Sequence, residues 1–218
     1  MNPSLKLLLG VLIALEISFT RSWMVNLGLA VIGLVIILTS RPKLSRFLLL
    51  LVIPLIPAVA LAMAILLQSN AGTHFAIVLF TRIYAYVFIG SAVTMTTSIS
   101  DLVMSLEQNA HVPSKFAYGF LGAFNLLPKI VSEVNIIRAA GNMRGQTLHV
   151  WSPKLYFKAV LASLNWSENL AEAMTSHGFV EDAPRSYFKR IHIRWWDWAT
   201  LIGVLVILQF ALFGLHLQ

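Results

Sequence analysis

Two basic side chains stand directly before glycines, at the ends of two helices that the sequence predicts. They are Arg144 before Gly145 and His177 before Gly178. A basic group suits the negative C-terminal end of a helix dipole, and glycine suits the position just beyond the helix. Arginine also makes bidentate contacts with the carboxylates of a partner protein. Helix capping explains either motif singly, but their recurrence in one chain favours a docking role.

The sequence offers little that would support catalysis or a resident metal ion. It has no cysteine, which excludes disulfides and thiolate metal sites. Its six histidines lack close metal-ligand spacing such as H-x3-H. It contains no phosphate loop of the G-x4-G-K-[ST] type and neither the H-E-x-x-H nor the G-x-S-x-G motif. We therefore predict a non-enzymatic chain that binds no cofactor or metal itself. Any energy-driven step that it takes part in must then draw its energy from a partner.

The composition is that of a membrane protein. Of the 218 residues, 58% are hydrophobic and 11% are charged, whereas a soluble domain carries about a quarter charged residues. The net charge of +7 would suit nucleic acid in a soluble protein. Here an excess of Lys and Arg on the cytoplasmic side of the membrane explains it better, and we expect no nucleic-acid partner.

Five apolar runs approach or exceed the length that crosses a bilayer, about 20 residues. They are Leu5–Phe19, Trp23–Thr39, Leu44–Leu67, His74–Thr97 and Trp196–Leu215. The first also fits a signal peptide, but no small-x-small cleavage site follows it, so we favour an uncleaved span. Pro54 and Pro57 predict a kink in the third run. Residues 68–73 predict a turn. The expected fold is therefore all-α, with about five transmembrane helices.

Charge in the loops predicts the orientation. Arg41, Lys43 and Arg46 follow the second span within a few positions, which places that loop in the cytoplasm. Parity then places the N-terminus inside and the C-terminus outside. It also places residues 98–195 inside, and this region holds ten of the sixteen Lys and Arg residues. We expect a four-helix transmembrane region at 1–97, a cytoplasmic region at 98–195 and a C-terminal span at 196–218, in the cell membrane.

The cytoplasmic region is too polar to span and too apolar to be an ordinary loop, so we expect it to be functional. Ser98 and Asp101 have capping-box spacing, which starts a short amphipathic helix near Ile99. Pro113 predicts a break after it.

Two longer amphipathic helices are predicted after the break. The pattern over Ser114–Arg144 is helical, with Pro128 expected to kink it, and Gly145 supplies the stop. Ser152-Pro153 begins a second helix that runs to about His177. The region thus holds two or three amphipathic helices.

Two other basic features have structural explanations. Arg82 lies inside the fourth span, where an arginine is a functional candidate, but packing against a neighbouring helix or reaching toward the outer surface explains it better. The run Lys189–Arg194 precedes Trp195 and Trp196. Basic residues followed by tryptophans are typical of a juxtamembrane anchor on membrane lipids.

Three segments together resemble the transmembrane T component of energy-coupling factor (ECF) transporters, the scaffold subunit of vitamin and metal-ion importers. They are TTSISDLVMSLE at 96–107, VPSKFAYGFLGAFNLLPKIVSEVNIIRAAGNMRG at 112–145 and NLAEAMTSHGF at 169–179. The resemblance covers about half of the chain in detail. It rests on the order of the three segments more than on any one of them.

The resemblance implies a mechanism in which two ABC ATPases bind the ends of the coupling helices and ATP is used by those subunits. Arg144 with Gly145 matches the first ATPase-contacting motif, and His177 with Gly178 occupies the second. A separate substrate-binding S component would lie against the apolar faces of the helices. The residues on those faces are Phe116, Phe120, Phe124, Leu127, Val131, Tyr156, Val160 and Leu164.

The sequence departs from the family pattern in two places. His177 stands where the family usually has arginine, so this contact lacks a fixed charge, and the stretch between the motifs is shorter than usual. Either departure fits a T component dedicated to one transporter. The alternatives are the permease of a conventional ABC transporter, or a membrane enzyme that modifies lipids, which would need clustered Asp, Glu or His. The transported substrate is not readable, because in this family another protein selects it.

Overall fold

The computed structural model describes residues 1–68, 72–149, 151–180, 183, 186–187 and 189–216. Over this part of the chain it contains nine helices and no strand. The chain divides into two compact units, Met1–Ser105 with Ile191–Gln218, and Leu106–Arg190. The all-α fold that the sequence predicts is therefore confirmed.

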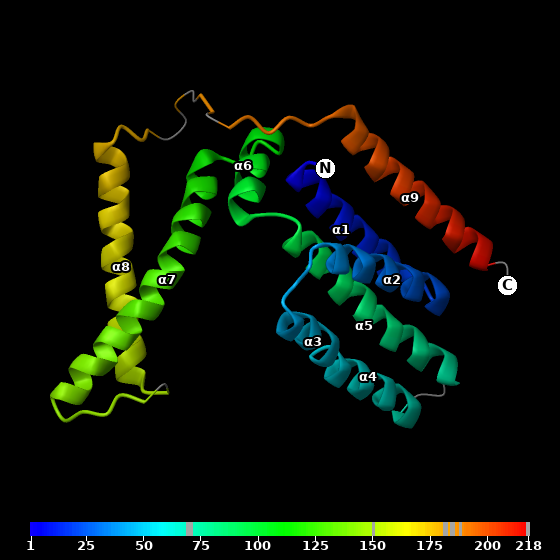
Figure 1. The fold of residues 1–218 in the computed structure, drawn as a ribbon, viewed down its shortest axis with the longest axis horizontal. Coiled ribbons are helices and arrows are strands. Elements are labelled where there is room, and N and C mark those ends of the chain that lie inside the picture. The colour runs from blue at the N-terminus through cyan, green and yellow to red at the C-terminus, as the bar shows by residue number, and fades with distance from the viewer. Residues whose placement is uncertain (69–71, 150, 181–182, 184–185, 188, 217–218) are drawn as a thin grey trace. The chain divides into compact units, whose positions relative to one another are not determined.

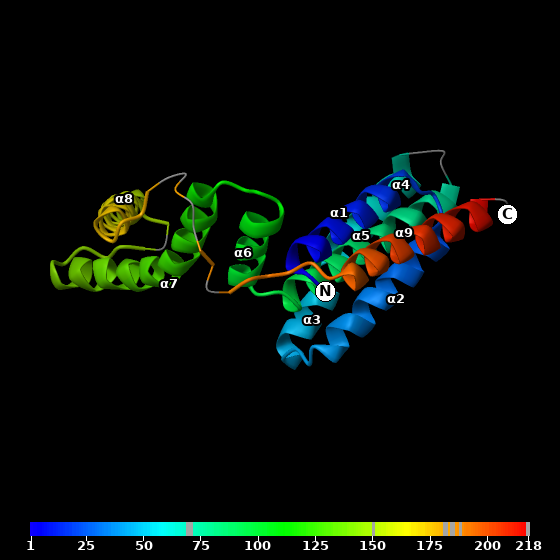
Figure 2. The same ribbon diagram turned by 90° about the horizontal axis from the view of Figure 1, so that it is seen from above.

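The first unit is built from apolar helices that lie side by side (Figures 1 and 2). Their bounds are α1 Pro3–Phe19, α2 Trp23–Thr39, α3 Leu44–Val52, α4 Leu55–Gln68, α5 Gly72–Met95 and α9 Trp195–His216, with α6 Ile99–Asn109 crossing into the second unit. Each of the five predicted apolar runs forms a helix or, for the third, a broken pair. Of the predicted turn at 68–73, residues 69–71 lie outside the described residues.

The break in the third run falls at the first of its two prolines. Helix α3 ends at Val52 and α4 begins at Leu55, with Pro54 between them. Because proline has no N–H group, Pro54 and Pro57 cannot donate to the helical ladder. Hydrogen bonding resumes where the Ala58 N–H donates to the Pro54 carbonyl at 3.0 Å. The predicted kink is confirmed.

Helix α5 lies at the centre of the first unit and packs against α2, α4 and α1. The buried cluster joins α1, α2, α5 and α9 through Ile13, Ile17, Val25, Leu29, Ala30, Ile37, Ala85, Phe88, Ala92 and Leu208. Asn26 of α2, fully buried, donates to the Val78 carbonyl of α5 at 3.2 Å. Such interhelical bonds suit apolar surroundings, where an unpaired amide is costly.

Polar side chains fasten the start of α1 to the connection between α5 and α6. Lys6 Nζ donates to the Thr96 carbonyl at 3.2 Å, just beyond the end of α5. Asn2 caps α1 by accepting from the Ser4 N–H, and its Oδ1 also accepts from the Ser105 hydroxyl of α6 at 2.6 Å. The predicted start of α6 is confirmed, because Ser98 Oγ accepts from the Asp101 N–H at 3.1 Å.

Length and composition admit four membrane spans among the described residues: Leu44–Leu67, Gly72–Met95, Ser114–Met143 and Trp195–Gly214. Helix α2, with 17 residues, is apolar but shorter, about 26 Å at 1.5 Å per residue. The segment Ser114–Met143, which we predicted to be cytoplasmic, qualifies because its first half carries few charges. Its placement at the inner surface, like the orientation of the termini, stays a prediction.

The second unit is an antiparallel pair, α7 Ser114–Met143 and α8 Pro153–Ser176 (Figure 1). Small residues of α7 and apolar residues of α8 form the contact. Ala117, Leu155 and Ala159 are buried, and a Cβ added at Gly122 would lie 3.0 Å from the Leu170 side chain. Figure 2 shows that the axis of α7 changes direction, as the internal Pro128 predicts.

The close approach of α2 to α5 predicts how glycine substitutions in α2 change the stability of the protein. A Cβ at Gly33 would lie 2.9 Å from the Phe88 carbonyl carbon, whereas one at Gly28 of the same helix meets nothing within 4 Å. We expect Gly33→Ala to destabilise the protein by about 1–3 kcal/mol through overpacking. Gly28→Ala should leave stability unchanged or raise it slightly, because alanine favours helix. Thermal unfolding in detergent distinguishes the two, and equal melting temperatures would contradict the close packing.

Candidate functional site

The first tip, Met143-Arg144-Gly145, ends α7 in a complete Schellman motif. Gly145 adopts φ +73°, and its N–H donates to the Asn142 carbonyl at 3.0 Å. The Gln146 N–H donates to the Gly141 carbonyl at 2.9 Å. Arg144 is thereby the C-cap residue, with φ −94° and ψ 12°.

The second tip, Ser176-His177-Gly178, ends α8 in the same way. Gly178 has φ +83°, its N–H donates to the Thr175 carbonyl at 2.9 Å, and the Phe179 N–H donates to the Met174 carbonyl at 2.9 Å. His177 is the C-cap residue, with φ −84° and ψ 10°. The backbone therefore presents Arg144 and His177 in nearly the same conformation.

Both tip side chains are exposed and make no hydrogen bond or ion pair with any residue that the structure describes. The helix-end carbonyls are satisfied by backbone N–H groups instead. Satisfying these carbonyls therefore does not require the basic side chains, and a favourable interaction with the helix dipole needs no hydrogen bond either. The geometry thus leaves Arg144 and His177 available to a partner.

The two tips lie at opposite ends of the antiparallel pair. The end of α8 lies beside the start of α7, since Tyr118 meets Phe179 edge-on at 5.7 Å between ring centroids. The 24 residues of α8 separate the tips by roughly 35 Å at 1.5 Å per residue. One helix pair therefore offers two distant contact points.

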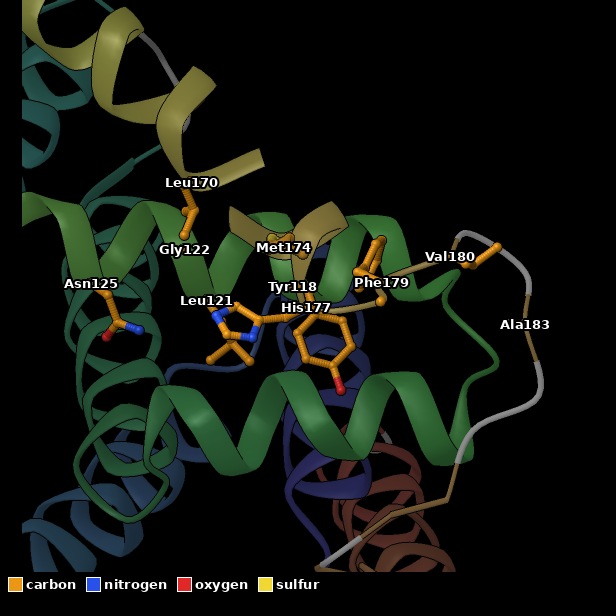
Figure 3. Close-up of a pocket in the computed structure, with 11 residues that line it drawn as sticks. Tyr118, Leu121, Gly122, Asn125, Leu170, Met174, His177, Phe179, Val180 and Ala183 are labelled. Carbon is orange, nitrogen blue, oxygen red and sulfur yellow. The ribbon is translucent and has the colours of Figure 1, made fainter. Parts of the chain in front are cut away.

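A pocket of about 610 Å³ adjoins the second tip. Figure 3 shows Tyr118, Leu121 and Asn125 of α7 and His177 and Phe179 of the α8 end among its lining residues. This pocket is not predictable from the hydropathy pattern of α7 and α8. The one indication of it in the sequence is Phe179, because an apolar residue two positions after the C-cap frequently packs back on its helix.

The predicted S-component face is exposed throughout. All eight of its side chains are between 43% and 63% exposed: Phe116, Phe120, Phe124, Leu127, Val131, Tyr156, Val160 and Leu164. None of them belongs to the buried contact between α7 and α8. Other apolar side chains of α8, such as Phe157 and Leu161, are exposed as well and are not among the eight predicted residues. The described part of the second unit thus leaves large apolar side chains substantially exposed.

Arg82 has a structural role. Its guanidinium donates to the carbonyl of Thr20, the C-cap residue of α1. A cation at this position interacts favourably with the negative end of the helix dipole. This contact between α5 and α1 agrees with the packing explanation for an arginine inside a span. The described residues contain no group of three or more His, Cys, Asp or Glu that would hold a metal ion.

Fold and site together define an all-α, polytopic membrane protein with a paired-helix unit that carries two equivalent tips. The family model described as cobalt transport protein (CbiQ) matches residues 1–187, which include both tips. The chain belongs to this family, that of the ECF transporter T components. Its members are membrane components of transporters that work with ATPase and substrate-binding partners. Among curated proteins, none matches the chain.

The tip geometry predicts a local stability effect. A side chain at positive φ costs about 1–2 kcal/mol, so Gly145→Ala and Gly178→Ala should loosen the last turns of α7 and α8. We expect amide exchange in those turns to rise by about fivefold or more. Gly119→Ala, inside α7 where a Cβ meets nothing within 4 Å, is the control and should not raise exchange. Unchanged exchange at both tips would rule out the Schellman ends.

Proposed function

We propose that this chain is the scaffold of an ECF-type importer, which couples ATP hydrolysis by two partner ATPases to movement of an S component. The observation that carries the proposal is the pair of tips. Two C-cap side chains with matching backbone angles stand at opposite ends of one helix pair. A scaffold that is gripped by two ATPase subunits needs two such points, and membership of the family supports this use.

Packing between α7 and α8 supports the use of the helix pair as a lever. Leu155 and Ala159 of α8 pack against α7, and the Arg138 Nε donates to the Leu148 carbonyl at 3.3 Å in the α7–α8 connection. A force applied at Arg144 is then transmitted along α7 to the rest of the unit. Closure of the ATPases on ATP binding would supply that force.

The S component would dock on the exposed apolar face of α7 and α8. Large exposed aromatic side chains such as Phe116, Phe120 and Phe124 are the usual anchors of a protein interface. Their steps of four residues set them along one side of α7. In a membrane protein such a contact allows sliding or toppling, because the face is apolar and makes few directional bonds.

The cargo would be chosen by the S component. The described residues supply no metal-ligand group, which suits a coupling subunit that does not hold cargo. The family description names cobalt, so we propose a metal ion as the first cargo to test, with a vitamin as the alternative.

The first experiment measures ATPase capture by the detergent-solubilised chain, using ABC ATPases encoded beside its gene. Arg144→Glu should weaken capture by about tenfold or more, because a charge-assisted contact contributes about 1.5–3 kcal/mol. Lys158→Glu makes the same charge change at an exposed position within α8 and should leave capture unchanged. If the wild-type chain captures no ATPase, the proposed function is wrong.

The second tip adds an internal comparison to this experiment. His177→Arg restores a fixed charge and should preserve or strengthen capture, whereas His177→Glu should weaken it. If both substitutions leave capture unchanged while Arg144→Glu abolishes it, the ATPases grip this chain at the first tip alone.

A further prediction concerns the apolar face. Phe120→Ser should lower co-purification of the S component by about tenfold, as expected for loss of a central aromatic anchor. Asn135→Ser changes an exposed polar residue of the same helix and should have no effect. ATPase capture by both variants should match the wild type, which separates the two interfaces. Undiminished S-component recovery with Phe120→Ser would contradict the proposed docking face.

A further inference from the structure

A second, different pocket, which we call the groove, lies in the first unit. It has a volume of about 610 Å³ and is lined by α1, α2, α5 and α9. Its walls are almost wholly apolar, with contributions from Ile13, Ile32, Val93 and Ile207. The pocket belongs neither to the tips nor to the face assigned to the S component.

The pocket is elongated along the helices. On α2 its lining runs from Met24 near the start to Ile36 near the end, and at the N-terminus it runs from Met1, just before α1, to Ile13 of α1. Ten or more residues of a helix extend over about 15 Å. The missing side chain of Gly28 helps to open it, since a Cβ there would meet nothing within 4 Å.

One end of the groove is basic. Among its described lining residues, Lys6 carries the sole charged side chain. Lys6 Nζ uses one bond on the Thr96 carbonyl, and an ammonium has three donors. The nearby Asp197 carboxylate is itself engaged, by the Met1 ammonium at 3.7 Å and by the Arg194 N–H.

The surroundings restrict what fills the groove. Water does not occupy an apolar cavity, and an empty one forfeits dispersion contacts along its walls. An extended hydrocarbon chain matches the shape and polarity of the walls. An anionic group at the head of that chain matches Lys6, and anionic phospholipids are concentrated in the cytoplasmic leaflet, where the start of α1 is predicted to lie.

We propose that this groove binds one acyl chain of an anionic phospholipid, with the lipid phosphate at the Lys6 ammonium. The bound chain completes the packing among α1, α2, α5 and α9, which otherwise leave a gap between them. The proposal does not depend on ATPase or S-component docking. A helix of the S component is the rival occupant, and the experiment distinguishes the two.

The experiment counts lipids retained by the purified full-length chain in native mass spectrometry, after incubation with phosphatidylglycerol or phosphatidylcholine. We expect one phosphatidylglycerol to be retained about fivefold better than phosphatidylcholine, because the choline cation offsets the phosphate charge and one basic residue near an anionic surface contributes about that much. Lys6→Gln, which can still donate to the Thr96 carbonyl, should remove this preference. Gly28→Leu should fill the groove and abolish retention of either lipid.

Gly90→Leu is the matched control, because a Cβ there also meets nothing within 4 Å and Gly90 lies outside the groove lining. It should retain lipid as the wild type does, and all variants should remain monodisperse with equal helical circular dichroism. Retention that Gly28→Leu leaves unchanged would overturn the proposal. Equal retention of the two lipids by the wild type would also overturn it. A Gly28→Leu variant that keeps its lipid but loses its S component would show that the S component is the occupant.

Discussion

The left-handed backbone at two glycines is the constraint on which both tips of the second unit depend. At φ +73° and +83°, Gly145 and Gly178 occupy a conformation that costs other residues about 1–2 kcal/mol. The chain turns back there, and its own N–H groups satisfy the last carbonyls of α7 and α8. The basic residues before the glycines are therefore not consumed in capping. A backbone constraint is what leaves Arg144 and His177 available for binding.

In the first unit, basic side chains satisfy carbonyl groups at or near the ends of helices. An apolar environment makes each unpaired polar group costly, and the carbonyls at helix ends are acceptors without an intrahelical partner. Arg82 donates to such a carbonyl at the end of α1, and Lys6 does so just beyond the end of α5. Each cation thus joins two helices without an acidic partner. This explains how charged side chains are kept among spans that carry few carboxylates.

The sequence predicted features that are encoded by local chemistry. The bounds of α2, the break at Pro54, the Ser98 cap and both glycine stops all follow from residues within a few positions of each other. The pocket beside His177 could not be predicted, since it needs Tyr118 to meet Phe179 across 61 positions. Hydropathy also does not decide whether Ser114–Met143 spans the membrane or lies at its surface. Composition does not say whether lipid or another protein contacts its apolar side. Tertiary contacts decide such questions, and the pattern of one segment does not contain them.

The difference between the tips has a physical consequence for how the two ATPases would be held. The backbone frames are alike, so any difference in affinity must come from side chains and their surroundings. Arg144 offers a permanent charge and a planar fork. His177 offers a smaller ring beside a pocket whose lining combines apolar residues such as Leu121 and Met174 with polar Asn125. A partner side chain that enters this pocket would be bound through packing contacts, whereas a partner at Arg144 would be bound through a charge pair. The grip at the second tip should therefore depend less on salt than the grip at the first, since screening weakens charge pairs and leaves apolar burial intact.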